Sequence, residues 1–99
     1  MSLVLIEAIR EGNTREALAM ISRGQGLQER NNNQRTPLHD ACRSGHTEVA
    51  MALMEREADI DARDDYQRTP LHDACDKGYT EVAMALMDRG ADIDARDND

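Results

Sequence analysis

The chain contains no phenylalanine and no tryptophan, and two tyrosines are its only aromatic residues among 99. Its core must therefore come from leucine, isoleucine, valine, methionine and alanine, which predicts one small domain of modest stability. Cysteine is also scarce, with two residues, and no signal peptide or long apolar run precedes them. This usage is typical of a reducing intracellular compartment, so we expect a cytoplasmic protein.

Positive charge is in the minority. The chain has 12 lysines and arginines against 20 aspartates and glutamates, which gives a formal net charge of -8. Such a chain is repelled by phosphate backbones and by anionic membrane surfaces. We therefore expect neither nucleic acid nor a membrane as partner, and the charge favours a protein partner with a neutral or basic surface.

What the chain does contain is an internal repeat of 33 residues. Residues 31–63 match residues 64–96 at 25 of 33 positions without a gap, and both segments contain the sequence TPLHDAC. Residues 1–30 match the next segment at only nine positions and lack TPLH. Repeats of this length predict a solenoid, in which each unit buries its apolar face against its neighbours.

The repeated motifs resemble those of the ankyrin repeat family. They are TPLH at 36–39 and 69–72, GHTEV and GYTEV at 45–49 and 78–82, and ADIDA at 58–62 and 91–95. The resemblance implies an all-α stack of helix-turn-helix units with projecting β-hairpin loops. We assign residues 1–30 to an N-terminal capping repeat, 31–63 and 64–96 to full repeats, and 97–99 to the start of a further repeat.

Residue types inside each unit predict where its helices begin and end. Thr36 is a suitable N-cap and Pro37 a suitable first helical residue. They predict a helix that runs to about Ser44 and ends at Gly45. A second helix is expected from about 47 to 56.

In the first unit, residues 3–11 predict a short helix closed by Gly12. A second helix is expected to be capped by Thr14 and ended by Gly24. Ile60 follows the second helix of the second unit, in the loop that leads to the third, and is expected to pack back against the stack.

Two departures from the family pattern concern turns. Gln34 and Gln67 stand at loop tips where the family places glycine, so we expect these tips to avoid a positive φ and use another turn type. Glu57 occupies the position after the second helix of its unit, which is glycine in the other two units, at Gly24 and Gly90. A left-handed glutamate would cost about 1 kcal/mol, so Glu57→Gly is expected to raise the melting temperature.

Comparison of the two full repeats indicates where a partner binds. Five of their eight differences, at 31/64, 32/65, 33/66, 43/76 and 44/77, fall at the loop tips and the exposed end of the first helix. In ankyrin repeats these positions line a concave groove, although neutral drift of surface residues would give similar differences. We assign partner binding to Asn32, Asn33, Arg35, Arg43, Ser44, Asp65, Tyr66, Arg68, Asp76 and Lys77. Tyr66 is the foremost candidate, as an aromatic anchor with a polar tip.

Other chemistries are disfavoured. His39 with Cys42 and His72 with Cys75 form two H-x-x-C pairs, but equivalent helices of a stack stand about 10 Å apart, too far to share one zinc ion. A cysteine–histidine nucleophile lacks an orienting group and an oxyanion hole. The acidic runs at 59–65 and 92–99 lack the central glycine and closing glutamate of a calcium loop. We therefore expect no metal, no cofactor and no catalysis, and predict a non-catalytic protein–protein interaction module.

Two apolar surfaces make self-association an alternative function. Leu18, Met51 and Met84 occupy one register on the second helices and predict an apolar stripe on the outer face, unless they are simply packed. At the end of the stack, Val82, Ala83, Leu86 and Met87 are expected to present an apolar side. Self-association through either surface, giving a homodimer, is the alternative function. An engineered scaffold without a natural partner is a further one.

Overall fold

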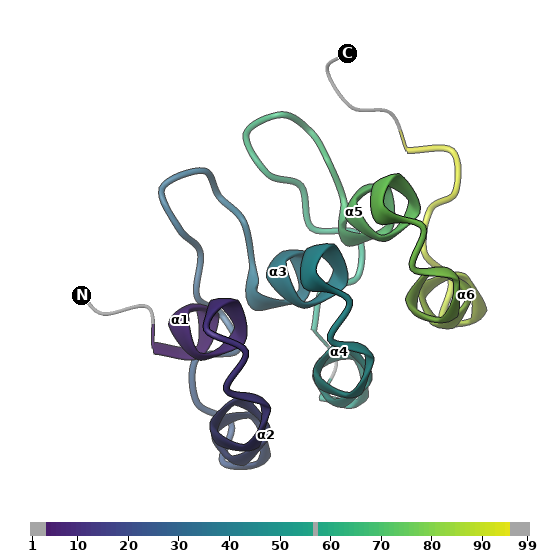
Figure 1. The fold of residues 1–99 in the computed structure, drawn as a ribbon. Helices are drawn as coiled ribbons and strands as arrows, with labels where there is room; N and C mark the ends of the chain where they lie inside the picture. Colours follow the sequence, from purple (N-terminus) through teal and green to yellow (C-terminus); the bar gives the residue numbers. More distant parts are fainter. Residues whose placement is uncertain (1–3, 57, 96–99) are drawn as a thin grey trace.

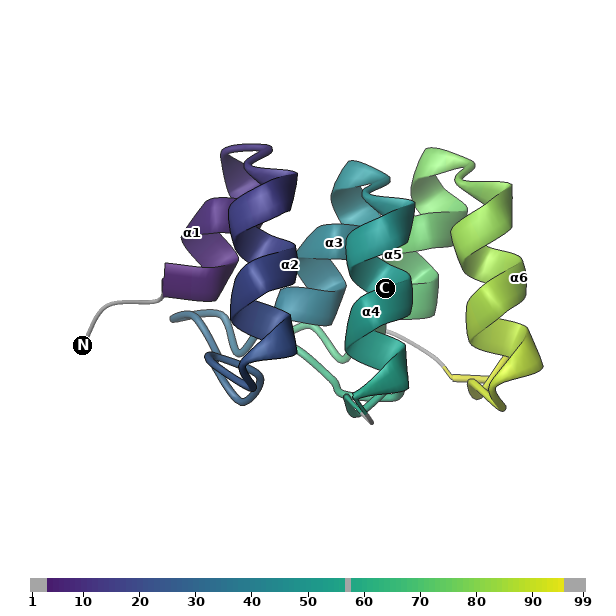
Figure 2. The same ribbon diagram turned by 90° about the horizontal axis from the view of Figure 1, so that it is seen from below.

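In the part of the chain that the structure describes, six helices form three antiparallel pairs that stand side by side (Figure 1). The computed structural model describes residues 4–56 and 58–95. The helices are α1 (Val4–Arg10), α2 (Thr14–Ser22), α3 (Pro37–Ser44), α4 (Thr47–Glu55), α5 (Pro70–Lys77) and α6 (Thr80–Asp88). Figure 2 shows α1, α3 and α5 as one layer and α2, α4 and α6 as the other. The expected all-α stack of helix-turn-helix units is confirmed.

Long loops join the pairs and project beyond the layer of α1, α3 and α5 (Figure 1). Each begins its turn with a backbone bond, from the Asn31 N–H to the Arg35 carbonyl at 3.0 Å and from the Asp64 N–H to the Arg68 carbonyl at 3.1 Å. No strand is assigned within the described residues, so the expected hairpins are loops rather than paired strands. A bond of 2.9 Å from the Asp65 N–H to the Asn33 carbonyl joins the neighbouring loops.

The first helix of each full repeat begins as the sequence predicts. Thr36 is the N-cap of α3, and its hydroxyl accepts from the His39 N–H at 3.3 Å. His39 Nδ1 in turn accepts from the Thr36 N–H at 3.1 Å, so the two residues satisfy each other's backbone donors. Thr69 repeats this arrangement on α5. Both helices end at a left-handed glycine, Gly45 on α3 with a φ of 72°.

The first unit starts its helices differently. Asn13, not Thr14, is the N-cap of α2, and its side chain accepts from the Glu16 N–H at 3.4 Å. The prediction was one residue late because an asparagine caps a helix as well as a threonine does.

A distant side chain satisfies the start of α1. The Glu29 carboxylate accepts from the backbone N–H groups of Leu5 at 3.2 Å and Ile6 at 3.0 Å. Glu29 thus replaces the Thr-Pro start that this unit lacks, and its negative charge suits a helix N-terminus.

The expectation for the loop tips was wrong. Gln34 and Gln67 both have a φ of 63°, in the left-handed region. A side chain at the start of each turn holds this conformation. Asn31 Oδ1 accepts from the backbone N–H groups of Asn33 at 2.9 Å and Arg35 at 3.0 Å, and an aspartate does the same in the next loop. Glu57 lies outside the described residues, so its substitution stays a prediction.

The core is continuous through the stack and consists of aliphatic residues. Leu5, Ile9, Ile21, Leu38 and Leu53 are at most 2% exposed. Ile60 is half-buried and packs against this core, as expected.

The apolar side expected at the end of the stack was mostly wrong. Val82, Ala83 and Leu86 are buried members of the hydrophobic core, and of that set Met87 is exposed. Residues 97–99, assigned above to a further repeat, lie outside the described residues.

Candidate protein-binding groove

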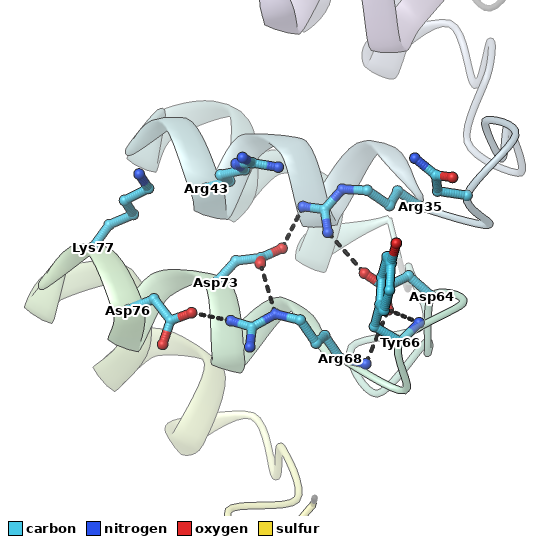
Figure 3. A pocket seen from close by; sticks show the side chains of 9 residues that line it. Arg35, Arg43, Asp64, Tyr66, Arg68, Asp73, Asp76 and Lys77 are labelled. Carbon is cyan, nitrogen blue, oxygen red and sulfur yellow. Dashed lines mark hydrogen bonds and ion pairs between the residues drawn. The ribbon is translucent and has the colours of Figure 1, made fainter. Parts of the chain in front are cut away.

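A cavity of about 340 Å³ lies between α3, α5 and the loop that precedes α5 (Figure 3). Its lining is polar and comes from two adjacent repeats: Asn33, Arg35, Arg43, Asp64, Tyr66, Arg68, Asp73, Asp76 and Lys77. We call this cavity the groove. Seven of the ten residues assigned to partner binding line it. Asn32, Ser44 and Asp65 are exposed but do not line it.

Arg35 is buried and forms the floor of the groove, and its assignment to partner binding stays a prediction. Its Nη1 lies 2.8 Å from Asp64 Oδ2 and its Nη2 lies 2.5 Å from Asp73 Oδ2. Its Nε is 3.6 Å from Asp40 Oδ1, which is beyond hydrogen-bond reach, so that contact is Coulombic. Burial acts to lower the pKa of Arg35, but the three carboxylates, led by Asp73, raise it above its ordinary value.

Asp64 ties the groove to the loop. Its Oδ1 accepts from the backbone N–H groups of Tyr66 at 2.9 Å and Arg68 at 3.0 Å. Burial acts to raise the pKa of Asp64, but these two donors and the Arg35 guanidinium hold that pKa below its ordinary range. The aspartate is therefore charged, and it fixes the backbone that presents Tyr66.

Arg68 occupies in the last repeat the position that Arg35 occupies in the repeat before. Its Nε lies 3.6 Å from Asp73 Oδ1, and its Nη2 pairs with Asp76. Figure 3 shows arginine and aspartate side chains alternating along the groove. An ionic ladder results, from Arg35 through Asp73 and Arg68 to Asp76.

Sequence reasoning missed Asp73 as a groove residue, and it placed position 64 in the groove without assigning Asp64 to partner binding. Asp73 is the equivalent of Asp40, and an aspartate in the apolar part of a helix motif was a signal that it had an ionic partner. The exposed part of the groove was found. Tyr66 is 63% exposed, and Arg43 and Lys77 are exposed on the last turns of α3 and α5.

His39 and Cys42 are buried parts of the scaffold. His39 Nε2 lies 2.8 Å from the Arg68 carbonyl and joins the second unit to the third, which assigns the proton to Nε2. Burial lowers the pKa of His39. Burial also raises the pKa of the Cys42 thiol far above its ordinary range, so it is unreactive. Within residues 4–56 and 58–95, no group of three or more His, Cys, Asp or Glu residues is arranged to hold a metal ion.

The residues expected to form an outer apolar stripe differ in exposure. Leu18 and Met51 are half-buried and pack against the core, whereas Met84 is 55% exposed. No described helix is both long and apolar enough to cross a membrane.

Three stacked helix pairs with projecting loops and a groove between adjacent units define a helical repeat protein of the solenoid class. The sequence family described as ankyrin repeats, in three copies, matches residues 5–97. The chain belongs to the ankyrin repeat family, and ankyrin repeats are in general protein–protein interaction modules. A comparison with curated proteins finds no match for the chain.

Proposed function

We propose that the chain is a non-catalytic module that binds a segment of a partner protein in the groove. The observation that supports this most is Tyr66, whose ring is exposed while its backbone is held by the buried Asp64. A rigidly presented aromatic costs little conformational entropy when it is covered, which makes it a typical binding anchor. The remaining polar groups of the groove floor pair with one another rather than converge on a reactive centre.

The test is a selection of binders from a displayed library of protein fragments, followed by affinity measurements on the purified chain. Tyr66→Ala should weaken groove binders by about tenfold or more, as expected for loss of an anchor. Its melting temperature should match that of the parent chain, because the ring is exposed. Asn32→Ala, an exposed loop change outside the groove lining, is the matched control and should leave affinity unaltered. Binders that tolerate Tyr66→Ala would contradict the proposal.

Self-association is a second candidate, favoured by the surface of α5 and α6. An open hollow of about 250 Å³ is lined there by Cys75, Tyr79, Met84, Met87 and smaller residues. Met84 and Met87 are 55% and 44% exposed, and flexible methionines suit adaptable apolar contacts. Light scattering over a hundredfold concentration range would show a growing mass, and replacing both methionines with lysine would remove it. A constant monomer mass in the parent chain excludes this role.

A further inference from the structure

The local charge of the groove is opposite to that of the chain. Its lining contains four cationic side chains and three carboxylates, so it has a formal charge of +1. The whole chain has a net charge of -8. The net charge favours a basic partner, but a bound segment interacts most strongly with the charges within about 10 Å of it, roughly one Debye length. The partner is therefore selected by the groove.

The carboxylates of the groove already form ion pairs with its arginines. Asp64 and Asp73 are buried and contact the Arg35 guanidinium. Asp76 is paired with Arg68. A basic partner would find no unpaired carboxylate in the lining and would have to displace an arginine to gain one.

Two cations of the groove are not committed. Arg43 and Lys77 are exposed and line the same cavity, and neither side chain forms an ion pair or hydrogen bond with any residue in the described part of the chain. They come from the last turns of two adjacent helices, α3 and α5. Figure 3 shows them at one end of the cavity and Tyr66 at the other.

Resting on the proposed function, we infer that the partner is an acidic peptide segment. Its carboxylates bind Arg43 and Lys77, and an apolar or aromatic side chain covers Tyr66. Arg43 presents a planar fork suited to a carboxylate, and Lys77 adds a second positive charge. Nucleic acid fits less well, because the chain is strongly acidic and the groove floor contains three carboxylates.

The same register in the other repeats supports the assignment. Lys77 corresponds to Ser44 and to Glu11, and Arg43 corresponds to Asp76 although Arg10 of the first unit shares its register, so the repeat pattern does not require a cation at either place. A cation in the last turn also stabilises a helix through its dipole, which is the structural role to be separated from binding.

The experiment selects a random library of displayed 12-residue peptides against the parent chain and measures the affinity of the enriched peptides. The test variant is Arg43→Gln with Lys77→Gln. The control is Arg15→Gln with Arg89→Gln, which removes the same charge from exposed residues outside the groove lining. Unfolding temperatures of both variants are measured beside the affinities.

The expected result is enrichment of aspartate and glutamate together with an apolar residue. The groove variant should bind these peptides about tenfold more weakly, from two exposed charge pairs, and the control variant about as well as the parent. Binding should also weaken as salt is raised.

Other outcomes overturn the inference in distinguishable ways. Neutral or basic peptides that need Tyr66 but not the two cations would refute the acidic partner and leave the proposed function standing. Peptides that need neither would refute both. A lower unfolding temperature of the groove variant with unaltered affinity would assign the cations to the helices alone. Equal, cation-dependent binding of a single-stranded oligonucleotide would show a polyanion site instead.

Discussion

Replacing Arg35 with methionine tests whether the ionic ladder holds the stack together. Methionine keeps a long unbranched side chain but removes the charge that Asp64, Asp73 and Asp40 share. Asp64 keeps its two backbone donors, and Asp40 keeps Arg10 at 3.4 Å. Among the ion pairs of the described residues, however, Asp73 then keeps the one with the half-buried Arg68, whose Nε lies 3.6 Å away.

The cost of this change is large for so small a domain. Removing one partner of a buried ion pair costs about 3–5 kcal/mol, because the other charge stays buried without compensation. The total free energy of unfolding of a small domain is about 5–15 kcal/mol. We therefore expect the melting temperature to fall by about 15–30 °C.

The assay is urea unfolding of the parent chain, Arg35→Met and Arg68→Met. The second variant is the matched control, since Arg68 holds the equivalent position but is half-buried and pairs with the exposed Asp76. Arg68→Met should lower the free energy of unfolding by about 1 kcal/mol. Equal costs for the two variants, or a loss below about 1 kcal/mol for Arg35→Met, would refute the reasoning.

Four further predictions concern the turns and pH. Gly78→Ala should cost about 1–2 kcal/mol for its left-handed φ of 72°. Gly45→Ala should cost more, since an added Cβ would lie 2.8 Å from the Tyr79 ring, and a Tyr79→Ala background should remove the excess. Gln67→Gly should raise the melting temperature by relieving a strain of about 1 kcal/mol, and an unaltered or lower value would contradict this. The pKa of His39 is lower in the folded state than in the unfolded state. Its contribution to the free energy of unfolding is therefore complete above pH 6.5 and declines below it, at no more than about 1.4 kcal/mol per pH unit. Urea unfolding at pH 7.5 and 5.5 checks this, and equal stabilities would count against it.

The helices that local chemistry determines could be predicted from the sequence. Thr36, Pro37 and Gly45 act on backbone groups within a few residues, so their types alone mark the start and end of α3. The tip at Gln34 was mispredicted because the propensity of one residue was weighed without the Asn31 side chain that stabilises the turn. Local propensity decides a turn only where no neighbouring side chain offsets its strain.

The groove could be predicted in its exposed part, and Arg35 is the one buried lining residue that was also assigned to it. Tyr66, Arg43 and Lys77 differ from their repeat equivalents, so comparing the repeats reveals them. Arg35 and Asp73 are identical to theirs, and that comparison cannot detect them. Their pairing joins two units at a separation of 38 residues, and it depends on how one repeat sits on the next rather than on either segment alone.

The clasp that Glu29 forms over the start of α1 sets an order on folding. A seven-residue helix is far below the length of about 12–15 residues at which isolated helices become even marginally stable. The acceptor for two of its unpaired N–H groups stands 24 and 23 residues downstream. The loop must therefore fold back before the start of α1 is satisfied, although α1 is the first helix along the chain. A chain cut between Ser22 and Glu29 would retain every helical residue of the first unit and still lose the acceptor at the start of its first helix. The beginning of this stack is completed by the last residues of its own first unit.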